Sequence, residues 1–192
     1  MKNISLFLLI SACLSACSNA TTSNSDAIIL FAEHSDNWLI EGEANWTFES
    51  GELVGYADST AGFLVSEKAF KDFELSLEFK PDRTINSGVF VRCAAAISAG
   101  DCYEINIWDL HPNQDYRTGA VVTLAVPLAQ VQSLNKWNTY KIICKDSRIQ
   151  AWVNGIQTVD LVNELHSEGT IALQANGVGE IRFRNVELKG LD

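Results

Sequence analysis

Strict alternation of apolar and polar residues is the feature of this sequence that most restricts its fold. Between Phe73 and Phe79 the apolar residues occupy every second position and polar residues occupy the positions between them. The same alternation occurs in Tyr103–Ile107, Arg148–Val153 and Glu180–Phe183. Residues two apart on a β-strand share a face, so each segment predicts a half-buried strand. Turn signals fall between these segments, the strongest being Asn154-Gly155.

About a dozen short strands of this kind predict an all-β domain, a sandwich of two packed antiparallel sheets. The chain has 192 residues, of which 47% are hydrophobic and 20% charged, and this composition suits one domain with a real core. A formal net charge of −10 argues against nucleic acid as a partner, because its phosphates would be repelled. No apolar run reaches ~18 residues, so no membrane-spanning helix is expected.

The first residues are expected to be a targeting segment and not part of the fold. Lys2 precedes an apolar stretch that runs into small residues, which is typical of a secretory signal peptide. The stretch ends in Leu14-Ser15-Ala16-Cys17, which resembles the lipobox of bacterial lipoproteins. We therefore expect residues 1–16 to be a lipoprotein signal peptide, 17–27 a polar tether that begins with a lipidated Cys17, and 28–192 the folded domain.

A protein of this kind is anchored to the bacterial cell envelope, because several acyl chains hold a membrane stably. Ser18 after the lipidated cysteine resembles the outer-membrane sorting pattern, so we expect the outer membrane, facing the periplasm or the exterior. The alternative is a plain signal peptide that is cut near Ala20.

Three cysteines remain in the expected mature domain once the lipidated one is set aside. Cys93 and Cys102 bracket a run of small residues between two strand-like segments, and outside the cytosol such a pair should oxidise. We expect a disulfide that closes this hairpin. Cys144 alternates in phase with the apolar residues Tyr140 and Ile142 and is expected to be a buried free thiol. No cysteine or histidine spacing suggests zinc.

Period two also assigns side chains to the faces of the expected sheets. If the apolar residues of the segment around Ile105 point into the sandwich, Glu104, Asn106 and Trp108 point outward. The same argument turns Arg92 outward on the preceding strand and Gln174 outward near the C-terminus. We therefore expect Arg92, Glu104, Asn106 and Gln174 on one polar surface beside Trp108.

Two interpretations of that surface remain open. It is either a solvated sheet face with an Arg92–Glu104 ion pair or a sugar-binding surface. Sugar hydroxyl groups bind planar polar side chains, and the apolar face of a sugar ring stacks on an aromatic ring, which Trp108 offers.

The segment from Asp109 to Arg117 is the most polar loop of the chain. Asp109, Asn113 and Asp115 offer oxygen ligands for calcium, but the glycine and the terminal glutamate of an EF-hand are missing. Calcium is therefore kept as an option, and no other cofactor is expected. His111 is a candidate for proton transfer, because histidine is the residue type that ordinarily changes its protonation near neutral pH.

Several short motifs follow one another in a fixed order and together resemble the 3-keto-disaccharide hydrolase domain family. They are Asn86–Arg92, Tyr103–Asp109, Thr118–Ala120, Lys136–Thr139, Trp152–Gly155, Gly169–Gln174 and Ile181–Val186. The resemblance runs from about Ile28 to Leu191. It implies a concanavalin A-like jelly-roll sandwich that acts on glycosides oxidised at C3, in a family whose members are often secreted or lipid-anchored. The chain departs from the family at Asn106, where a Gln is usual, and at Ala175-Asn176, where Asp-His is usual.

A ketone at C3 of a sugar acidifies the hydrogen on C2, so a base can remove that proton and expel the aglycone from C1. Addition of water then completes a net hydrolysis. For this reaction we expect Glu104 or His111 to be the base and Arg92 to stabilise the enolate oxygen. The expected substrate-binding residues are Asn106, Trp108, Asp109 and Gln174.

Three alternatives remain. One is direct hydrolysis by two carboxylates, Glu104 with Asp109 or Asp115. Another is a non-catalytic carbohydrate-binding lipoprotein, since a fold does not determine a function. The last is a structural role in the envelope.

Overall fold

Twelve β-strands and one short 3-10 helix form in the residues that the computed structural model describes, 27–94, 96–98 and 100–191. In chain order they are β1 (Ile28–Ile29), β2 (Trp38–Gly42), β3 (Asn45–Glu49), β4 (Glu52–Asp58), β5 (Gly62–Ser66), β6 (Phe73–Pro81), β7 (Ile85–Cys93), β8 (Tyr103–Ile107), η1 (Gln114–Tyr116), β9 (Asn138–Lys145), β10 (Arg148–Val153), β11 (Ile156–Val162) and β12 (Thr170–Gly190). The predicted all-β fold is confirmed.

The expected signal peptide and the lipidation site Cys17 lie outside the described residues. None of the described segments forms a helix that is long and apolar enough to cross a membrane.

The alternation of apolar and polar residues every second position explains why these segments form strands. Along β6 every second residue from Phe73 to Pro81 is buried and the residues between are half-buried. This strand therefore packs one face on the core and shows the other to its surroundings, as the alternation predicted.

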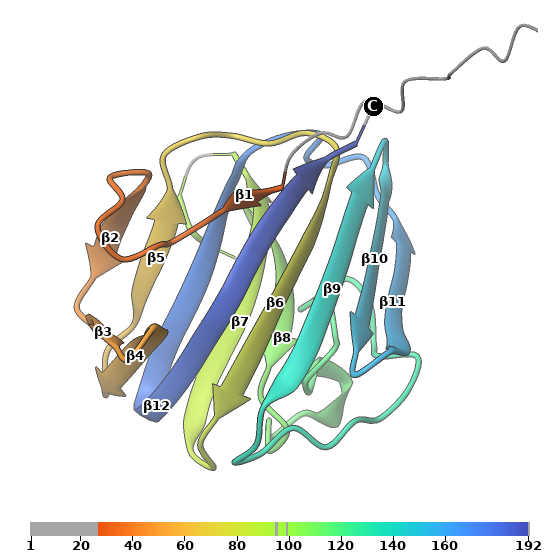
Figure 1. The fold of residues 1–192 in the computed structure, drawn as a ribbon. Helices are drawn as coiled ribbons and strands as arrows, with labels where there is room; N and C mark the ends of the chain where they lie inside the picture. The colour runs from red at the N-terminus through yellow and green to blue at the C-terminus, as the bar shows by residue number, and fades with distance from the viewer. Residues whose placement is uncertain (1–26, 95, 99, 192) are drawn as a thin grey trace, which may run out of the picture.

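The strands form two antiparallel layers that share β12 (Figure 1). Sheet A has the order β11-β10-β9-β6-β12-β4-β3, with the short β1 beside the end of β12. Sheet B has the order β2-β5-β12-β7-β8. The segment after η1 extends sheet B beyond β8, because Val121 pairs with Ile105.

Strand β12 passes from one layer to the other. Its first half pairs with β5 and β7, and its second half pairs with β4 and β6. Gly177 and Gly179 lie at this crossing with φ angles of 78° and 130°, a conformation that side chains oppose. A Cβ atom on Gly179 would also lie 2.4 Å from Oδ2 of Asp82, so this position needs glycine.

The main core lies between the sheets, and a second, smaller apolar cluster lies on the outer face of sheet B. The smaller cluster contains Val65, Phe90, Ala172 and the disulfide Cys93–Cys102, with Phe63 and Ile97 packed against it. The predicted disulfide is confirmed. Cys144 is a buried free thiol in the main core, also as predicted.

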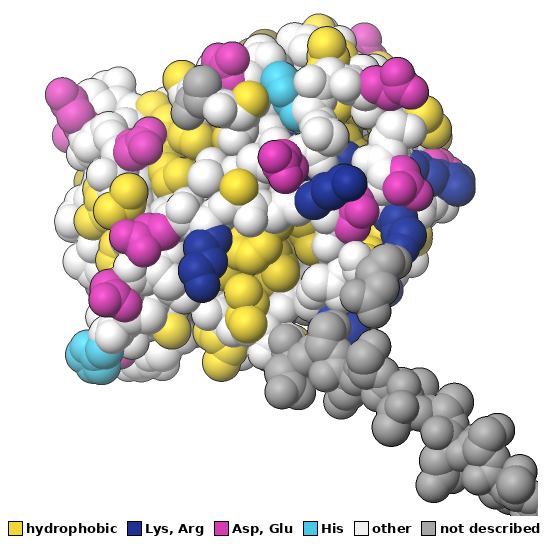
Figure 2. Space-filling model, turned by 90° about the horizontal axis from the view of Figure 1, so that it is seen from above, with side chains coloured by type: hydrophobic (Ala, Val, Ile, Leu, Met, Phe, Trp, Pro, Cys, Tyr) yellow, Lys and Arg dark blue, Asp and Glu magenta, His cyan; other side chains and the backbone are white. Residues whose placement is uncertain are grey.

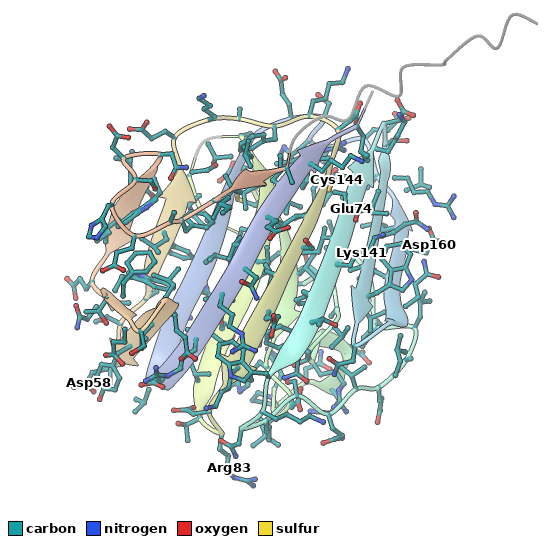
Figure 3. All side chains as sticks on the ribbon, viewed as in Figure 1. Asp58, Glu74, Arg83, Lys141, Cys144 and Asp160 are labelled. Carbon is teal, nitrogen blue, oxygen red and sulfur yellow. A yellow bond between two sulfur atoms is a disulfide. The ribbon has the colours of Figure 1, made fainter. Side chains whose placement is uncertain are left out.

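Charged side chains of both signs are interspersed at the end of the sandwich where the chain enters (Figure 2). The view shows no continuous patch of one sign. On the visible face of sheet A, Glu74 and Lys141 form an ion pair of 3.0 Å (Figure 3). Glu78 pairs with Arg184 at 2.6 Å on the same sheet. These two carboxylates of sheet A thus each have a cationic neighbour.

Candidate functional site

The outer face of sheet B, here called the B face, is built from two rows of cross-strand neighbours. One row runs from Ala172 on β12 through Phe90 on β7 to Glu104 on β8. The other row runs from Gln174 through Gly88 to Asn106. Leu173 pairs with Val89 in antiparallel register, so the next residue, Gln174, lies beside Gly88. Gly88 in turn pairs with Asn106. Pairing therefore brings Glu104, Asn106 and Gln174 to one surface from two well-separated parts of the sequence.

Glu104 is the unusual charged group of the B face. Its side chain is half-buried, and no described residue donates a hydrogen bond to its carboxylate or forms an ion pair with it. Burial raises the pKa of Glu104 from 4.5 to about 7, because removing water disfavours the charged form. Phe90, directly opposite, contributes apolar surroundings. Glu104 can therefore accept or donate a proton near neutral pH.

Two amide oxygens of the B face are buried without a hydrogen-bond partner among the described residues. They are Oε1 of Gln174, a residue that is 6% exposed, and Oδ1 of Asn86. A buried acceptor that finds no donor costs about 1–3 kcal/mol, so natural proteins rarely leave one unused. Hydroxyl groups of a bound molecule or of water would satisfy both oxygens.

Asn106 lies in the expected row, but its amide is committed to the protein, so the expectation that it binds substrate is wrong. The residue is 1% exposed, its Nδ2 donates to the carbonyl oxygen of Tyr116, and its Oδ1 accepts from the backbone N–H of Ile107 at 2.9 Å. Its role is to hold the loop around η1 against β8.

The expectation that Arg92 points outward is wrong, and a β-bulge is the reason. Thr170 pairs with Cys93 and Ala172 pairs with Phe90, so two residues of β7 face one residue of β12 between these pairs. Arg92 occupies the bulge with a φ angle of 53°. The extra residue reverses the parity, so that Cys93 joins Phe90 on the B face while Arg92 turns inward.

The inward side chain of Arg92 is fully buried and joins the loops at one end of the sandwich. It donates to the carbonyl oxygens of Lys71 at 2.8 Å, Asp146 at 2.7 Å and His166 at 3.4 Å, and it pairs with Asp72 at 3.1 Å. A guanidinium group held in this way cannot reach a ligand on the B face. Arg92 is a structural residue.

Trp108, His111 and Tyr116 form an aromatic cluster at the end of β8. The rings of Trp108 and His111 meet edge-on with centroids 4.5 Å apart, and those of His111 and Tyr116 are 5.6 Å apart. Nδ1 of His111 lies 2.7 Å from the carbonyl oxygen of Asn113. Trp108 and His111 are both half-buried and lie beyond the Asn106 end of the B face.

Asp109 is not available to a substrate or to calcium, which corrects the expectation for this residue. It is 4% exposed, and its two oxygens accept hydrogen bonds from the N–H of Ser133 at 2.7 Å and from the hydroxyl group of Ser133 at 2.8 Å. Oδ1 of Asn113 accepts from the N–H of Asp115 at 3.1 Å. These contacts hold the loop together. Among the described residues, no three acidic, histidine or cysteine side chains form a metal-binding group.

Sequence reasoning missed three residues of the B face, namely Asn86, Gly88 and Phe63. The parity of β7 provides a signal for the first two, because Asn86 and Gly88 alternate in phase with Phe90. Phe63 lies in the continuous apolar run of β5, whose pattern cannot distinguish the two faces. In the structure its ring meets the ring of Phe90 edge-on at 5.5 Å.

The fold matches solved structures of carbohydrate-related proteins. A candidate glycosyl hydrolase from Parabacteroides distasonis ATCC 8503 is 24% identical, with a TM-score of 0.75 over 86% of this chain and 100% of that chain. A second candidate glycosyl hydrolase from that organism is 21% identical, with a TM-score of 0.67 over 77% of this chain and 84% of the other. The carbohydrate-binding module CBM66 from Bacillus subtilis is 18% identical, with a TM-score of 0.63 over 80% and 96%. At these identities the likenesses show a shared fold.

The family is established by the sequence itself. A comparison with curated proteins found no significant match. Residues 26–189 match the model of a family described as the 3-keto-alpha-glucoside-1,2-lyase-like domain, a span that covers nearly all of the described residues. The chain therefore belongs to the 3-keto-alpha-glucoside-1,2-lyase-like domain family.

Proposed function

We propose that the protein binds a glycoside oxidised at C3 on the B face and cleaves its glycosidic bond by elimination, with Glu104 as the base. The observation that carries the proposal is the unpaired, half-buried carboxyl group of Glu104, whose pKa burial raises to about 7. A base is most effective when its pKa lies near the working pH. Membership of a lyase-like family supports this type of reaction.

The proposed reaction begins when the carboxylate of Glu104 takes the proton from C2 of the sugar. The C–H electron pair moves onto the C3 oxygen and gives an enolate. The enolate then re-forms the C3 ketone while a C1–C2 double bond forms and the C1–O bond breaks, and the leaving oxygen takes the proton that the Glu104 carboxyl group returns. The products are an unsaturated 3-keto sugar and the free aglycone. Addition of water to the double bond completes a net hydrolysis. The sequence of steps needs no cofactor.

The negative charge that develops on the C3 oxygen needs hydrogen-bond donors. Arg92 cannot supply them because its side chain is fully buried at the end of the sandwich. The NH₂ groups of Gln174 and Asn86 are the donors that the B face offers, since no group in the described part of the chain accepts a hydrogen bond from either of them. We propose that they replace Arg92 in this role.

His111 remains the second candidate for the base. It lies with Trp108 beyond the end of β8, and its Nδ1 is already in contact with Asn113. Glu104 is preferred because its carboxylate has no competing partner among the described residues and lies within the two rows of the B face.

The test uses purified protein with a 3-keto disaccharide and its unoxidised parent, and measures the released monosaccharide. Glu104→Gln should lower turnover of the 3-keto substrate by about 100-fold or more, because it removes the base while nearly keeping the shape of the side chain. Glu187→Gln is the matched control, since Glu187 is exposed on β12 in sheet A. If Glu104→Gln keeps wild-type turnover, the base is not Glu104. A loss in His111→Ala would then place it in the loop.

The second candidate function is glycan binding without turnover. The lack of cations on the B face favours this function. No lysine or arginine occurs in β5, in β8 or in residues 170–177 of β12. The single basic residue of β7 is Arg92, and its side chain is turned inward. A face without a cation stabilises an enolate less well. The shared fold of CBM66 supports the same function. Wild-type protein that binds the disaccharide and releases no monosaccharide would establish this alternative.

We also propose that the mature protein is a lipoprotein of a bacterial envelope, anchored through Cys17 and placed at the outer membrane. The support is the sequence Leu14-Ser15-Ala16-Cys17 after an apolar run. The site would then meet glycans in the periplasm or outside the cell.

A further inference from the structure

The disulfide between Cys93 and Cys102 lies on the B face beside Glu104, the proposed base. Cys102 precedes Glu104 by two residues, and Phe90 lies directly opposite Glu104 on β7. Both belong to the smaller apolar cluster, which therefore borders Glu104 along its own strand and across to the next. Cys93 is 4% exposed and Cys102 is 2% exposed, so this border excludes water although it lies on the outside of a sheet.

The other neighbours of Glu104 bring no charge to it. On the side away from β7, the N–H of Val122 donates to the carbonyl oxygen of Glu104 at 3.0 Å, and residues 118–123 contain no charged side chain. On β7 the one charged residue, Arg92, is turned inward. Asp101, the charged residue nearest along the chain, is hydrogen-bonded within its own loop. Among these described neighbours, the apolar cluster therefore dominates the surroundings of the carboxyl group.

The β-bulge of β7 is what makes this disulfide possible. Val91 pairs with Tyr103, so a regular register would place Arg92 opposite Cys102. The extra residue turns Arg92 into the sandwich and brings Cys93 to the B face in its place. The buried contacts of Arg92 thus hold the bulge from the inside, and the disulfide holds it from the outside.

The loop between β7 and β8 is closed without help from the disulfide. The N–H of Ala94 donates to the carbonyl oxygen of Asp101 at 2.8 Å, which joins the two ends of the loop. Ile97, at the middle of the loop, packs against the smaller cluster. The cross-link therefore adds something beyond closure, because it fixes this loop and its apolar side chain onto the sheet next to Glu104.

We infer that the Cys93–Cys102 disulfide is a positioning element of the site, which keeps the smaller cluster packed beside Glu104 and so keeps water from one side of its carboxyl group. Without the bond, the loop that carries Ile97 lifts from the sheet more readily, and water then solvates the carboxylate. The bond thus sets the pH range in which the base works. The inference deepens the proposed function, on which its catalytic part rests.

The test follows the titration of the Glu104 carboxyl group by carbon NMR, with Glu104→Gln to identify the signal. Cys93→Ser with Cys102→Ser removes the bond and the apolar sulfur atoms, whereas Cys93→Ala with Cys102→Val removes the bond and keeps apolar side chains. Because burial raises the pKa of Glu104 from 4.5 to about 7, added water should lower it. We expect both double variants to titrate lower by about 1 pH unit or more, and the pH of half-maximal kcat/KM for a 3-keto disaccharide to fall with it.

Cys144→Ser is the matched control, because it places the same substitution in the main core and leaves the smaller cluster intact. Its titration should equal that of the wild type even where its stability is lower. If the wild type releases no monosaccharide but the titration falls in both double variants, the positioning role stands and the elimination fails.

An unchanged titration in both double variants would overturn the inference, since the disulfide would then only stabilise the fold. A change confined to the serine variant would also overturn it, because packing and not the bond would be the cause. Should neither double variant fold, Ile97→Ala decides the outcome, because it trims the smaller cluster and keeps the bond. A lower titration midpoint in Ile97→Ala supports the inference, and a wild-type midpoint overturns it.

Discussion

Phe90 and Glu104 lie directly opposite each other where β7 pairs with β8, on the outer face of sheet B. Phe90 is 2% exposed and belongs to the apolar cluster that contains the disulfide. The carboxyl group therefore lies beside apolar surface, no described residue forms an ion pair with it, and burial raises the pKa of Glu104 to about 7.

The pH dependence of turnover should report the ionisation of Glu104. A base acts in its ionised form, so kcat/KM for a 3-keto disaccharide should rise as the pH passes through about 7 and level off above it. Initial rates between about pH 5 and pH 9 measure this. Rates that are already constant from pH 5 upward would contradict the assignment, because they would indicate a base with an ordinary carboxyl pKa.

Glu104→Gln should stabilise the folded protein at alkaline pH. The pKa of Glu104 is about 7 in the folded state against 4.5 for an ordinary glutamate, so between these values the folded state binds the extra proton and stability falls as pH rises. Above about pH 7 the full cost of the buried charge is present, and glutamine removes it. We expect a gain of about 1–3 kcal/mol in the free energy of unfolding at pH 8 and almost none at pH 4. Urea denaturation at both pH values measures it, and an equal change at both would refute this explanation.

Arg92→Met should destabilise the fold without changing the chemistry. It removes the buried partner of Asp72 and of three carbonyl oxygens, and breaking such a buried pair costs about 3–5 kcal/mol. Arg148→Met is the control, because its pair with Asp160 is exposed to solvent and contributes little to stability. Denaturation measures the stability. A normal free energy of unfolding with a large loss of kcat would instead return Arg92 to the active site.

Replacing both Cys93 and Cys102 by serine should lower the free energy of unfolding by about 2–3 kcal/mol, because the disulfide closes a short loop in the unfolded chain. Burial raises the pKa of Cys144 to about 12, so its thiol should resist alkylation until the protein unfolds. Urea denaturation measures the loss of stability. Mass spectrometry of alkylated peptides reports the disulfide pairing and the reactivity of Cys144. A bridge from Cys144 to either partner would contradict the pairing.

Cys17→Ser should release the protein from the membrane fraction or block its processing. The expectation follows from Leu14-Ser15-Ala16-Cys17 after an apolar run, because lipidation requires the cysteine thiol. Fractionation of cells that express each form measures it. A serine variant that is still processed and still bound to membranes would refute the lipid anchor.

Local pattern was sufficient for most of the fold. Alternation predicted the strands, the two-sheet architecture and the outward direction of Glu104, because the two-residue period of a strand is a local property of the backbone. The hairpin around Cys93 and Cys102 was also readable, since its ends are close in sequence. Gly88 and Asn86 shared the parity of Phe90 and were within reach of the same argument.

Only the tertiary structure decided which polar residues are available to a ligand. The direction of Arg92 depends on a β-bulge that arises where β7 pairs with β12, far away in sequence, and no local pattern records an extra residue in such a pairing. Asn106 and Asp109 are occupied by Tyr116 and Ser133, partners that the chain brings back through loops. The sequence by itself determined which face each regular strand residue takes. Pairing over long distances decided which of those residues remain free, because a hydrogen-bond partner is a property of the folded chain and not of its period.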